Sequence, residues 1–517
     1  MKSKLSLVTA FLLLLIPSAD AQSFREKLLA IDGVISVEEI EQDEKVFEEK
    51  YIVTIEQPVN WADPQSEMFP QRFEIGYQSD DSPNLFYLSG YMLSDGRFKQ
   101  DDRPELAKMY NTNYIRCEYR FYSKSAPEDL SRDNTKYWLY LNEKNAAQDF
   151  HRIIDELKDI LTGKWIFTGV SKGGKATAAF ATYYPHDADV YVPSVAPFAD
   201  EATGVFTQNL YETIGNERYG SELAAKYRSE LLEFQIEAVK NRSYMQDVFW
   251  RNVESGDVKV RPFVNKQIMF DMIILEFTVT TWQYDQNFEA IEKVLAMPRE
   301  DDPSTETDEK RAFQDAMIKC ITDANVGSYV WGLDYLFQYY VQAATEMGEH
   351  DYNFDYLRKA LAADGSGAEL AITPDMDKDI LYRMMFTDEQ MEAFTFSPDT
   401  RNRIYEWIRT TDSKVIFLYG TSDPWYSLSI TEDDLAGNTH VKIIADPNQS
   451  HSFKIANLPE EMRNEIISII DEAIIDDRGV HSKNSSGCNL TGTGLFLIIL
   501  MMMVMTQRRK TVWKSSR

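Results

Sequence analysis

A serine between two glycines stands at residues 169–173, where the chain reads Gly-Val-Ser-Lys-Gly. Residues 165–167 before it are bulky and strand-like, and residues 173–184 after it have the small side chains of a packed helix that ends before Pro185. This context favours a nucleophile elbow, a sharp strand-to-helix turn that exposes a serine hydroxyl and leaves no room for side chains beside it. Ser171 is therefore the candidate nucleophile, and an ordinary glycine-rich turn is the alternative.

A serine hydroxyl needs a histidine base. The chain has six histidines, which are His151, His186, His350, His440, His451 and His481. In a fold with such an elbow the partners follow in the order serine, acid, histidine, each after the carboxyl end of a strand. The first two come too early, the third falls in a long helical stretch and the last in the linker to the tail. His440 precedes the strand-like residues 441–444, whereas His451 follows them, so position selects His451 and leaves His440 as a surface residue.

The acid should follow the preceding strand. Residues 415–419 are strand-like, and Asp423 comes directly after them in the segment 420–425. Its carboxylate would accept a hydrogen bond from the imidazole, fix the tautomer and stabilise the imidazolium. The structural alternative is an Asx turn before Pro424.

An oxyanion hole requires two donors. The backbone N–H of Lys172, directly after the nucleophile, is one, and the loop after the third strand, at residues 88–91, should give the other. We expect the N–H of Tyr91 or Gly90 there, against the alternative of a plain turn at Gly90. The side chain of Lys172 receives no role. Because no histidine or cysteine cluster has ligand spacing and no glycine-rich phosphate loop occurs, no metal or other cofactor is expected.

The elements around these residues alternate between strand and helix. Strand-like runs occur at residues 51–55, 72–77, 84–88, 114–121, 165–167 and 190–195, and helical periodicity occurs at residues 143–161, with Asn142 as N-cap, and at residues 173–184. The four runs before residue 143 could form the opening strands of a sheet, and the alternation of helix and strand from residue 143 onward predicts a parallel sheet with right-handed crossovers.

A long helical stretch then interrupts the sheet. Residues 200–404 show helical periodicity and almost no strands, before strand signals return at 415–419 and 441–444 and an amphipathic helix follows at 459–475. We therefore predict an α/β domain in two parts, 22–199 and 405–480, with residues 200–404 as a helical cap over the carboxyl edge of the sheet.

Both ends of the chain carry targeting features. Residues 1–21 combine Lys2 and Lys4, an apolar run and Ala-Asp-Ala, which predicts a cleaved signal peptide and export. Residues 481–517 lead through Cys488 into a short apolar run followed by basic residues. This pattern is typical of a sorting signal processed near Cys488 or of a short membrane anchor, and both readings place the protein at a surface. If Cys488 belongs to the tail, the body has only Cys117 and Cys320, which are too few for a disulfide scaffold.

The composition indicates a globular and acidic protein. Hydrophobic residues make up 44% of the chain and the net charge is −29. Without the signal and the tail from Cys488 onward, which carry net charges of +1 and +5, the body has a charge of −35. This surplus argues against nucleic acid as a partner and would favour cationic substrates.

With these residues in place, the sequence resembles serine peptidase family thirty-seven, the secreted tripeptidyl aminopeptidases, and more distantly the Pro-X carboxypeptidase and dipeptidyl peptidase family. The similarity is carried by residues 118–122, 124–127, 142–147, 149–153, 164–166, 169–174 and 195–197. The resemblance implies an α/β-hydrolase domain with a helical cap, acting on peptides with a free amino terminus. Carboxylates must then bind the terminal ammonium, and Asp200 and Glu201 are candidates, with an exposed acidic loop as the alternative.

The sequence thus predicts a secreted serine exopeptidase that releases short peptides, expected to be tripeptides, through an acyl-enzyme. A surface esterase or lipase of the same fold is one alternative, because a fold does not fix the substrate. A surface binding protein without turnover is the other. The number of residues released, the preference for proline and the oligomeric state stay open.

Overall fold

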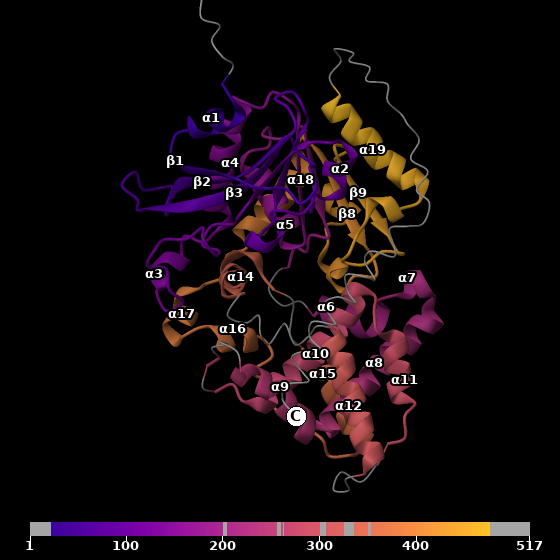
Figure 1. The fold of residues 1–517 in the computed structure, drawn as a ribbon. Helices are drawn as coiled ribbons and strands as arrows, with labels where there is room; N and C mark the ends of the chain where they lie inside the picture. Colours follow the sequence, from indigo (N-terminus) through magenta and orange to yellow (C-terminus); the bar gives the residue numbers. More distant parts are fainter. Residues whose placement is uncertain are drawn as a thin grey trace, which may run out of the picture. The chain divides into compact units, whose positions relative to one another are not determined.

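A mixed sheet organises the part of the chain that the computed structural model describes, which is residues 22–199, 204–255, 260–261, 263–299, 307–324, 336–349 and 353–475. Its strands lie in the order β1-β2-β3-β5-β4-β6-β7-β8-β9 (Figure 1). Their bounds are β1 Val34–Glu39, β2 Glu49–Pro58, β3 Met68–Tyr77, β4 Asn84–Leu88, β5 Asn113–Cys117, β6 Trp165–Val170, β7 Val190–Ser194, β8 Lys414–Gly420 and β9 Val441–Asp446.

The pairing of neighbouring strands changes once across the sheet, from antiparallel to parallel. From β1 to β5 the neighbouring strands are antiparallel, whereas the pairs from β5 through β4, β6, β7 and β8 to β9 are parallel. The parallel strands therefore end at one common edge. Ser171, Asp423 and His451 all follow strands that end there.

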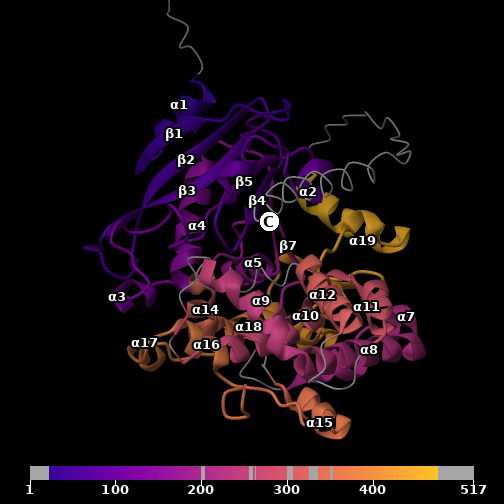
Figure 2. The same ribbon diagram turned by 60° about the horizontal axis from the view of Figure 1, so that its bottom comes forward.

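Helices cover both faces of the sheet. Successive residues of a strand point to opposite faces, so Leu85 and Phe86 of β4 belong to two separate apolar cores. One core is closed by α1 (Phe24–Leu29), α4 (Glu143–Lys158), α5 (Lys172–Tyr183) and α18 (Asp399–Thr410). The other is closed by α2 (Glu105–Met109) and α19 (Glu460–Ile474), which lie on the same side of the sheet (Figure 2). The Asn142 side chain caps α4 by accepting the N–H of Asn145, as predicted.

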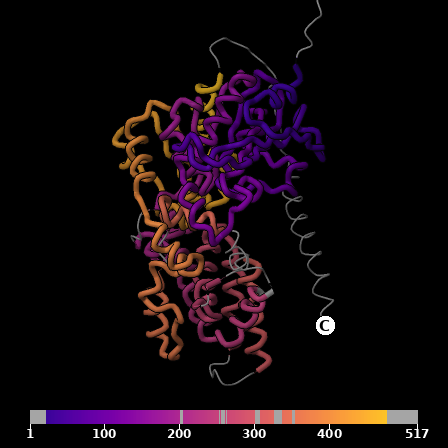
Figure 3. Tube along the Cα trace, turned by 90° about the vertical axis from the view of Figure 1, so that its left-hand side faces the viewer, coloured from indigo at the N-terminus to yellow at the C-terminus, as the bar shows by residue number. Residues whose placement is uncertain are grey.

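Between β7 and β8 the described residues form helices and no strands. Figure 1 shows most of them beyond the edge at which the parallel strands end, and in Figure 3 most of the same stretch, coloured from magenta to orange, lies below the indigo part of the chain. Besides α18, which packs against the sheet, they are α6 Val205–Gln208, α7 Asn216–Tyr219, α8 Ser221–Lys240, α9 Arg242–Ser255, α10 Lys266–Tyr284, α11 Phe288–Leu295, α12 Asp308–Asp323, α14 Phe337–Gln342, α15 Asp355–Asp364, α16 Ile380–Met385 and α17 Asp388–Ala393, with the π-helical turns η2 Asn209–Thr213 and η3 Ala343–Met347. These helices and the sheet belong to one compact unit that ends at Ile475.

The remaining short elements connect the strands. They are α3 Thr135–Trp138 and the 3₁₀ turns η1 Asp95–Arg97, η4 Pro424–Leu428, η5 Glu432–Leu435 and η6 Ile455–Asn457. Cys117 and Cys320 are buried free thiols. Within the described ranges no helix is long and apolar enough to cross a membrane, and the predicted signal and tail lie outside those ranges.

Candidate active site

Ser171 occupies a tight turn between β6 and α5. Its φ of 58° and ψ of −122° are a strained conformation for a residue with a side chain. The flanking glycines make the turn possible, because a Cβ at Gly169 would lie 2.3 Å from the Gly173 carbonyl oxygen and one at Gly173 would lie 2.1 Å from the carbonyl oxygen of Leu88. The elbow geometry predicted from the pentapeptide is therefore present.

The acid and base candidates form a buried pair. Asp423 Oδ2 lies 2.6 Å from His451 Nδ1, and the two side chains are 2% and 9% exposed. The other carboxylate oxygen of Asp423 accepts the N–H of Trp425 at 3.2 Å, which holds the carboxylate at the start of η4. Because Nδ1 faces the carboxylate, it carries a proton in the neutral ring and leaves Nε2 as the acceptor, as a general base requires.

The loop that carries His451 is held from two directions. Ser422 Oγ donates to the Pro447 carbonyl at 2.8 Å and so joins the loops after β8 and β9. From the inserted helices, the Gln283 carbonyl at the end of α10 accepts the N–H of His451 at 3.0 Å. The Tyr284 ring stands edge-on to the imidazole with a centroid distance of 6.4 Å. The position of the histidine thus depends on the cap as well as on the sheet.

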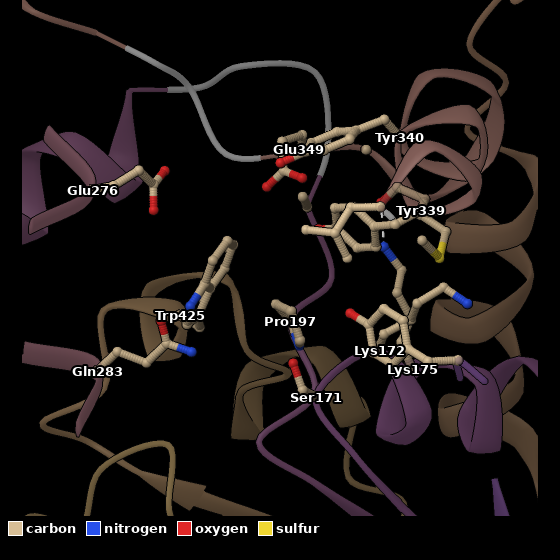
Figure 4. A pocket seen from close by; sticks show the side chains of 15 residues that line it. Ser171, Lys172, Lys175, Pro197, Glu276, Gln283, Tyr339, Tyr340, Glu349 and Trp425 are labelled. Atoms are coloured by element: carbon tan, nitrogen blue, oxygen red, sulfur yellow. Dashed lines mark hydrogen bonds between the residues drawn. The ribbon is translucent and has the colours of Figure 1, made fainter. Parts of the chain in front are cut away.

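A pocket of about 170 Å³ opens above Ser171 (Figure 4). Its floor comes from the loops of the sheet and its upper wall from the inserted helices. The lining residues include Tyr91, Ser171, Lys172, Lys175, Pro197 and Trp425 from the first group, and Glu276, Gln283, Leu336, Tyr339, Tyr340 and Glu349 from the second.

Two carboxylates in this pocket were missed by the sequence analysis. Glu276 lies on α10 and Glu349 follows η3, and both lie on the side of the pocket opposite Ser171 in Figure 4. Glu276 is 9% exposed. No spacing relates these residues, which are far apart in the chain, so only the packing of the insertion reveals that they share a wall.

The predicted oxyanion donors lie beside the elbow. Lys172 is the first residue of α5, and Tyr91 lines the pocket next to it. The N–H of Tyr91 also reaches Ser89 Oγ at 3.3 Å, a long contact that is weak by hydrogen-bond standards. The structure leaves both Tyr91 and Gly90 as candidates for the second donor.

Other predicted residues lie elsewhere. His440 is exposed at the start of β9, in agreement with its surface interpretation. Asp200 and Glu201, the candidates for binding the substrate amine, lie outside the described residues. The side chain of Lys172, which received no role, is buried beneath the pocket.

A parallel sheet with a serine elbow after β6, and with a paired aspartate and histidine after β8 and β9, defines the α/β-hydrolase class. Within that class the sequence gives a narrower assignment. The chain belongs to the PS-10 peptidase S37 family, whose profile matches residues 18–493. The protein is therefore a serine peptidase, and the predicted fold class and enzyme class are both confirmed.

Several known proteins are similar to this chain. The chain is 27% identical over 458 residues to the prolyl tri/tetrapeptidyl aminopeptidase of Streptomyces mobaraensis. This alignment covers 86% of this chain and 83% of the relative. Among solved structures it is similar to esterase E22, with 12% identity, a TM-score of 0.41 and coverage of 81% and 100% of the two chains. The proline iminopeptidase of Mycobacterium smegmatis matches with 12% identity, a TM-score of 0.34 and coverage of 81% and 98%.

Proposed function

We propose that this protein is an exported aminopeptidase that releases tripeptides or tetrapeptides from free amino termini. The observation that carries the proposal is the pocket that holds Ser171 at its floor and two carboxylates on its opposite wall. The name of the Streptomyces relative supports the length of the released peptide.

The proposed reaction is acyl transfer. Ser171 Oγ attacks the peptide carbonyl while His451 takes its proton and Asp423 stabilises the imidazolium. The backbone N–H of Lys172, together with that of Tyr91 or Gly90, stabilises the tetrahedral oxyanion. His451 then protonates the leaving amine, and water, deprotonated by the same imidazole, hydrolyses the acyl-enzyme and frees the serine.

The substrate ammonium is assigned to Glu276 and Glu349. A terminal ammonium loses its hydration in the pocket, and carboxylates replace that hydration with charge-assisted hydrogen bonds. With the ammonium fixed at one wall and the scissile carbonyl at Ser171, the distance between them sets the number of residues released. Asp200 and Glu201 stay candidates for the same role.

Hydrolysis of fluorogenic tripeptide and tetrapeptide amides, each compared with its N-acetylated form, tests this function. We expect cleavage of the free amines only and no activity in Ser171→Ala. Glu276→Gln and Glu349→Gln should raise KM about 10-fold or more, since each loses a charge-assisted bond of about 1.5–3 kcal/mol. Glu369→Gln, an exposed glutamate of the insertion, serves as the matched control. Equal cleavage of acetylated substrates would contradict the aminopeptidase assignment.

An esterase is the second candidate, because the elbow and the paired side chains would cleave esters by the same steps. Acyl p-nitrophenyl esters assayed beside the peptides separate the two, and ester turnover without peptide turnover would favour the esterase. A binding protein without turnover would fail to react with a fluorophosphonate at Ser171. Export is tested by fractionating cells that express the full chain, with mature protein beginning near Gln22 as the expected result.

A further inference from the structure

The Lys172 side chain is the feature of the site that the proposed mechanism does not use. Lys172 directly follows the nucleophile and is 3% exposed. Its Nζ turns back under the elbow and donates to the Gly90 carbonyl at 2.5 Å. An ammonium withdrawn from water is costly unless it is paired, so its surroundings must stabilise the charge.

Three aromatic rings surround this ammonium. Nζ lies 3.8 Å from the ring centroid of Tyr119, 5.3 Å from that of Tyr91 and 5.4 Å from that of Tyr122. Ring faces attract a cation and do little for a neutral amine. The cage therefore favours the protonated side chain.

Two buried carboxyl groups lie nearby. Burial raises the pKa of both, to about 8 for Glu346, so only their ionised fraction adds to this effect. Glu143 on α4 and Glu346 on η3 lie in the same interior, where Glu346 Oε1 accepts the N–H of Glu143 at 2.7 Å and Thr400 Oγ1 donates to Glu346 Oε2 at 3.0 Å. Lys175, one turn along α5, is the second buried cation and donates to the Met347 carbonyl. Burial lowers the pKa of Lys172 to about 8, while the charges of Glu143 and Glu346 oppose the decrease.

The group that Lys172 holds is itself close to the reacting atoms. Gly90 has a φ of +72°, and a Cβ there would lie 2.9 Å from the Gly173 backbone nitrogen. The loop after β4 therefore touches the elbow directly. It carries both candidates for the second oxyanion donor.

We propose that Lys172 is a positioning residue, whose ammonium holds the Gly90 carbonyl and thereby fixes the second oxyanion donor relative to Ser171. The inference rests on the proposed serine mechanism. Lys172 then contributes to both donors of the oxyanion hole. Its N–H is the first donor, and its side chain orients the loop that supplies the second.

Steady-state kinetics on the free-amine substrate test the assignment. Since one misplaced donor costs up to about 10²–10³ in kcat, we expect Lys172→Met to lower kcat at least about 10-fold and to leave KM within about 3-fold. Lys172→Arg, which retains a cation, should recover part of the loss. Lys164→Met, a half-exposed lysine just before β6, is the control for loss of a lysine near the same strand.

The pH dependence separates positioning from simple packing. The groups that face the ammonium are Glu143, Glu346, Lys175 and the three tyrosines. Because Lys172 loses its proton as pH rises through its pKa of about 8, wild-type kcat should decline above that pH. In Lys172→Arg the guanidinium stays charged, so the decline should disappear. This profile needs only the arginine variant and remains informative where the methionine variant does not fold.

Two results would overturn the inference. One is a folded Lys172→Met enzyme, judged by its melting temperature, with wild-type kcat. The other is an unchanged alkaline decline in Lys172→Arg, which would assign the titration to Lys175, to Glu346 or to the terminal ammonium of the substrate. Failure of the serine mechanism itself would appear separately, as full activity in Ser171→Ala.

Discussion

At the scale of single residues, the proposed chemistry depends on the orientation of one imidazole. His451 presents Nδ1 to Asp423 at 2.6 Å, and both groups are buried. An aspartate in this position favours the tautomer in which Nε2 is the acceptor, which the proposed proton transfer from Ser171 requires. In this role Asp423 contributes both the orientation of the His451 ring and a negative charge beside it.

Asp423→Asn removes the charge and keeps the shape. We expect kcat to fall by about 10⁴-fold, because the amide donates to Nδ1 and favours the wrong tautomer, as the same change does in a serine protease triad. Asp412→Asn, at an exposed position two residues before β8, should retain wild-type kcat. Comparable activity of the two variants would argue against the triad.

Gly173→Ala tests the close approach of the elbow and β4. The added Cβ would lie 2.1 Å from the Leu88 carbonyl oxygen, which is backbone and cannot turn away. We expect the free energy of unfolding to fall by about 1–3 kcal/mol and activity to be lost as the elbow shifts. Gly96→Ala has open space around its Cβ and should change neither quantity. Urea denaturation and kcat measure both effects.

Residues of this site can be predicted from the sequence where a local motif or the order of the strands marks them. The elbow is a local motif, and the order of Asp423 and His451 after it follows from the topology of the sheet, so these residues could be selected in advance. Glu276 could not, because buried residues occur on all sides of α10 and the sequence does not show which of them face the pocket. Glu349 follows η3, and no local motif relates it to the other residues of the pocket.

At the scale of elements, α4 is joined to the strand ends by a buried ion pair. Arg120 donates from Nε and Nη2 to the two oxygens of Asp149 on α4, at 2.7 and 3.0 Å, and both side chains are fully buried. The remaining guanidinium hydrogens reach the carbonyls of Pro58, Val59 and Tyr140. One arginine thereby ties together the end of β2, the loop after β5 and the helix.

Asp149→Asn leaves that guanidinium buried without its counter-charge. Breaking one side of a buried pair typically costs about 3–5 kcal/mol, so we expect a loss of this order in the free energy of unfolding. Asp155→Asn, an exposed position on the same helix, should stay within about 0.5 kcal/mol of the wild type. A similar small effect at both positions would show that the pair contributes little.

The central strands and α4 could be predicted because burial gives them strong apolar patterns. The edge strand β1 and the short helix α1 were missed. Only Val37 of β1 is buried, since an edge strand has one neighbour and faces solvent along its length. A half-exposed strand leaves too weak a pattern to separate it from a loop.

At the scale of the whole molecule, the acidic charge should affect how substrates arrive. The chain carries a net charge of −29. A lysine-containing peptide should therefore have a higher kcat/KM than its neutral analogue at low salt, by several-fold, and lose that advantage near 0.5 M salt, where the Debye length falls to about 4–5 Å. Stopped assays of the two peptides across a salt series measure the ratio. If the ratio of the two kcat/KM values does not change with salt, the net negative charge does not affect substrate arrival and serves solubility only.

The hydrogen bond from the His451 N–H to the Gln283 carbonyl has a consequence for the evolution and engineering of this enzyme. The C-terminal end of α10 contacts the proposed base as well as the pocket, so exchange of the whole insertion would alter both. A chimaera that received the whole stretch between β7 and β8 from a relative would inherit new specificity with a displaced base. A chimaera that keeps the position of His451 has to retain the C-terminal end of α10 and exchange only the helices around it.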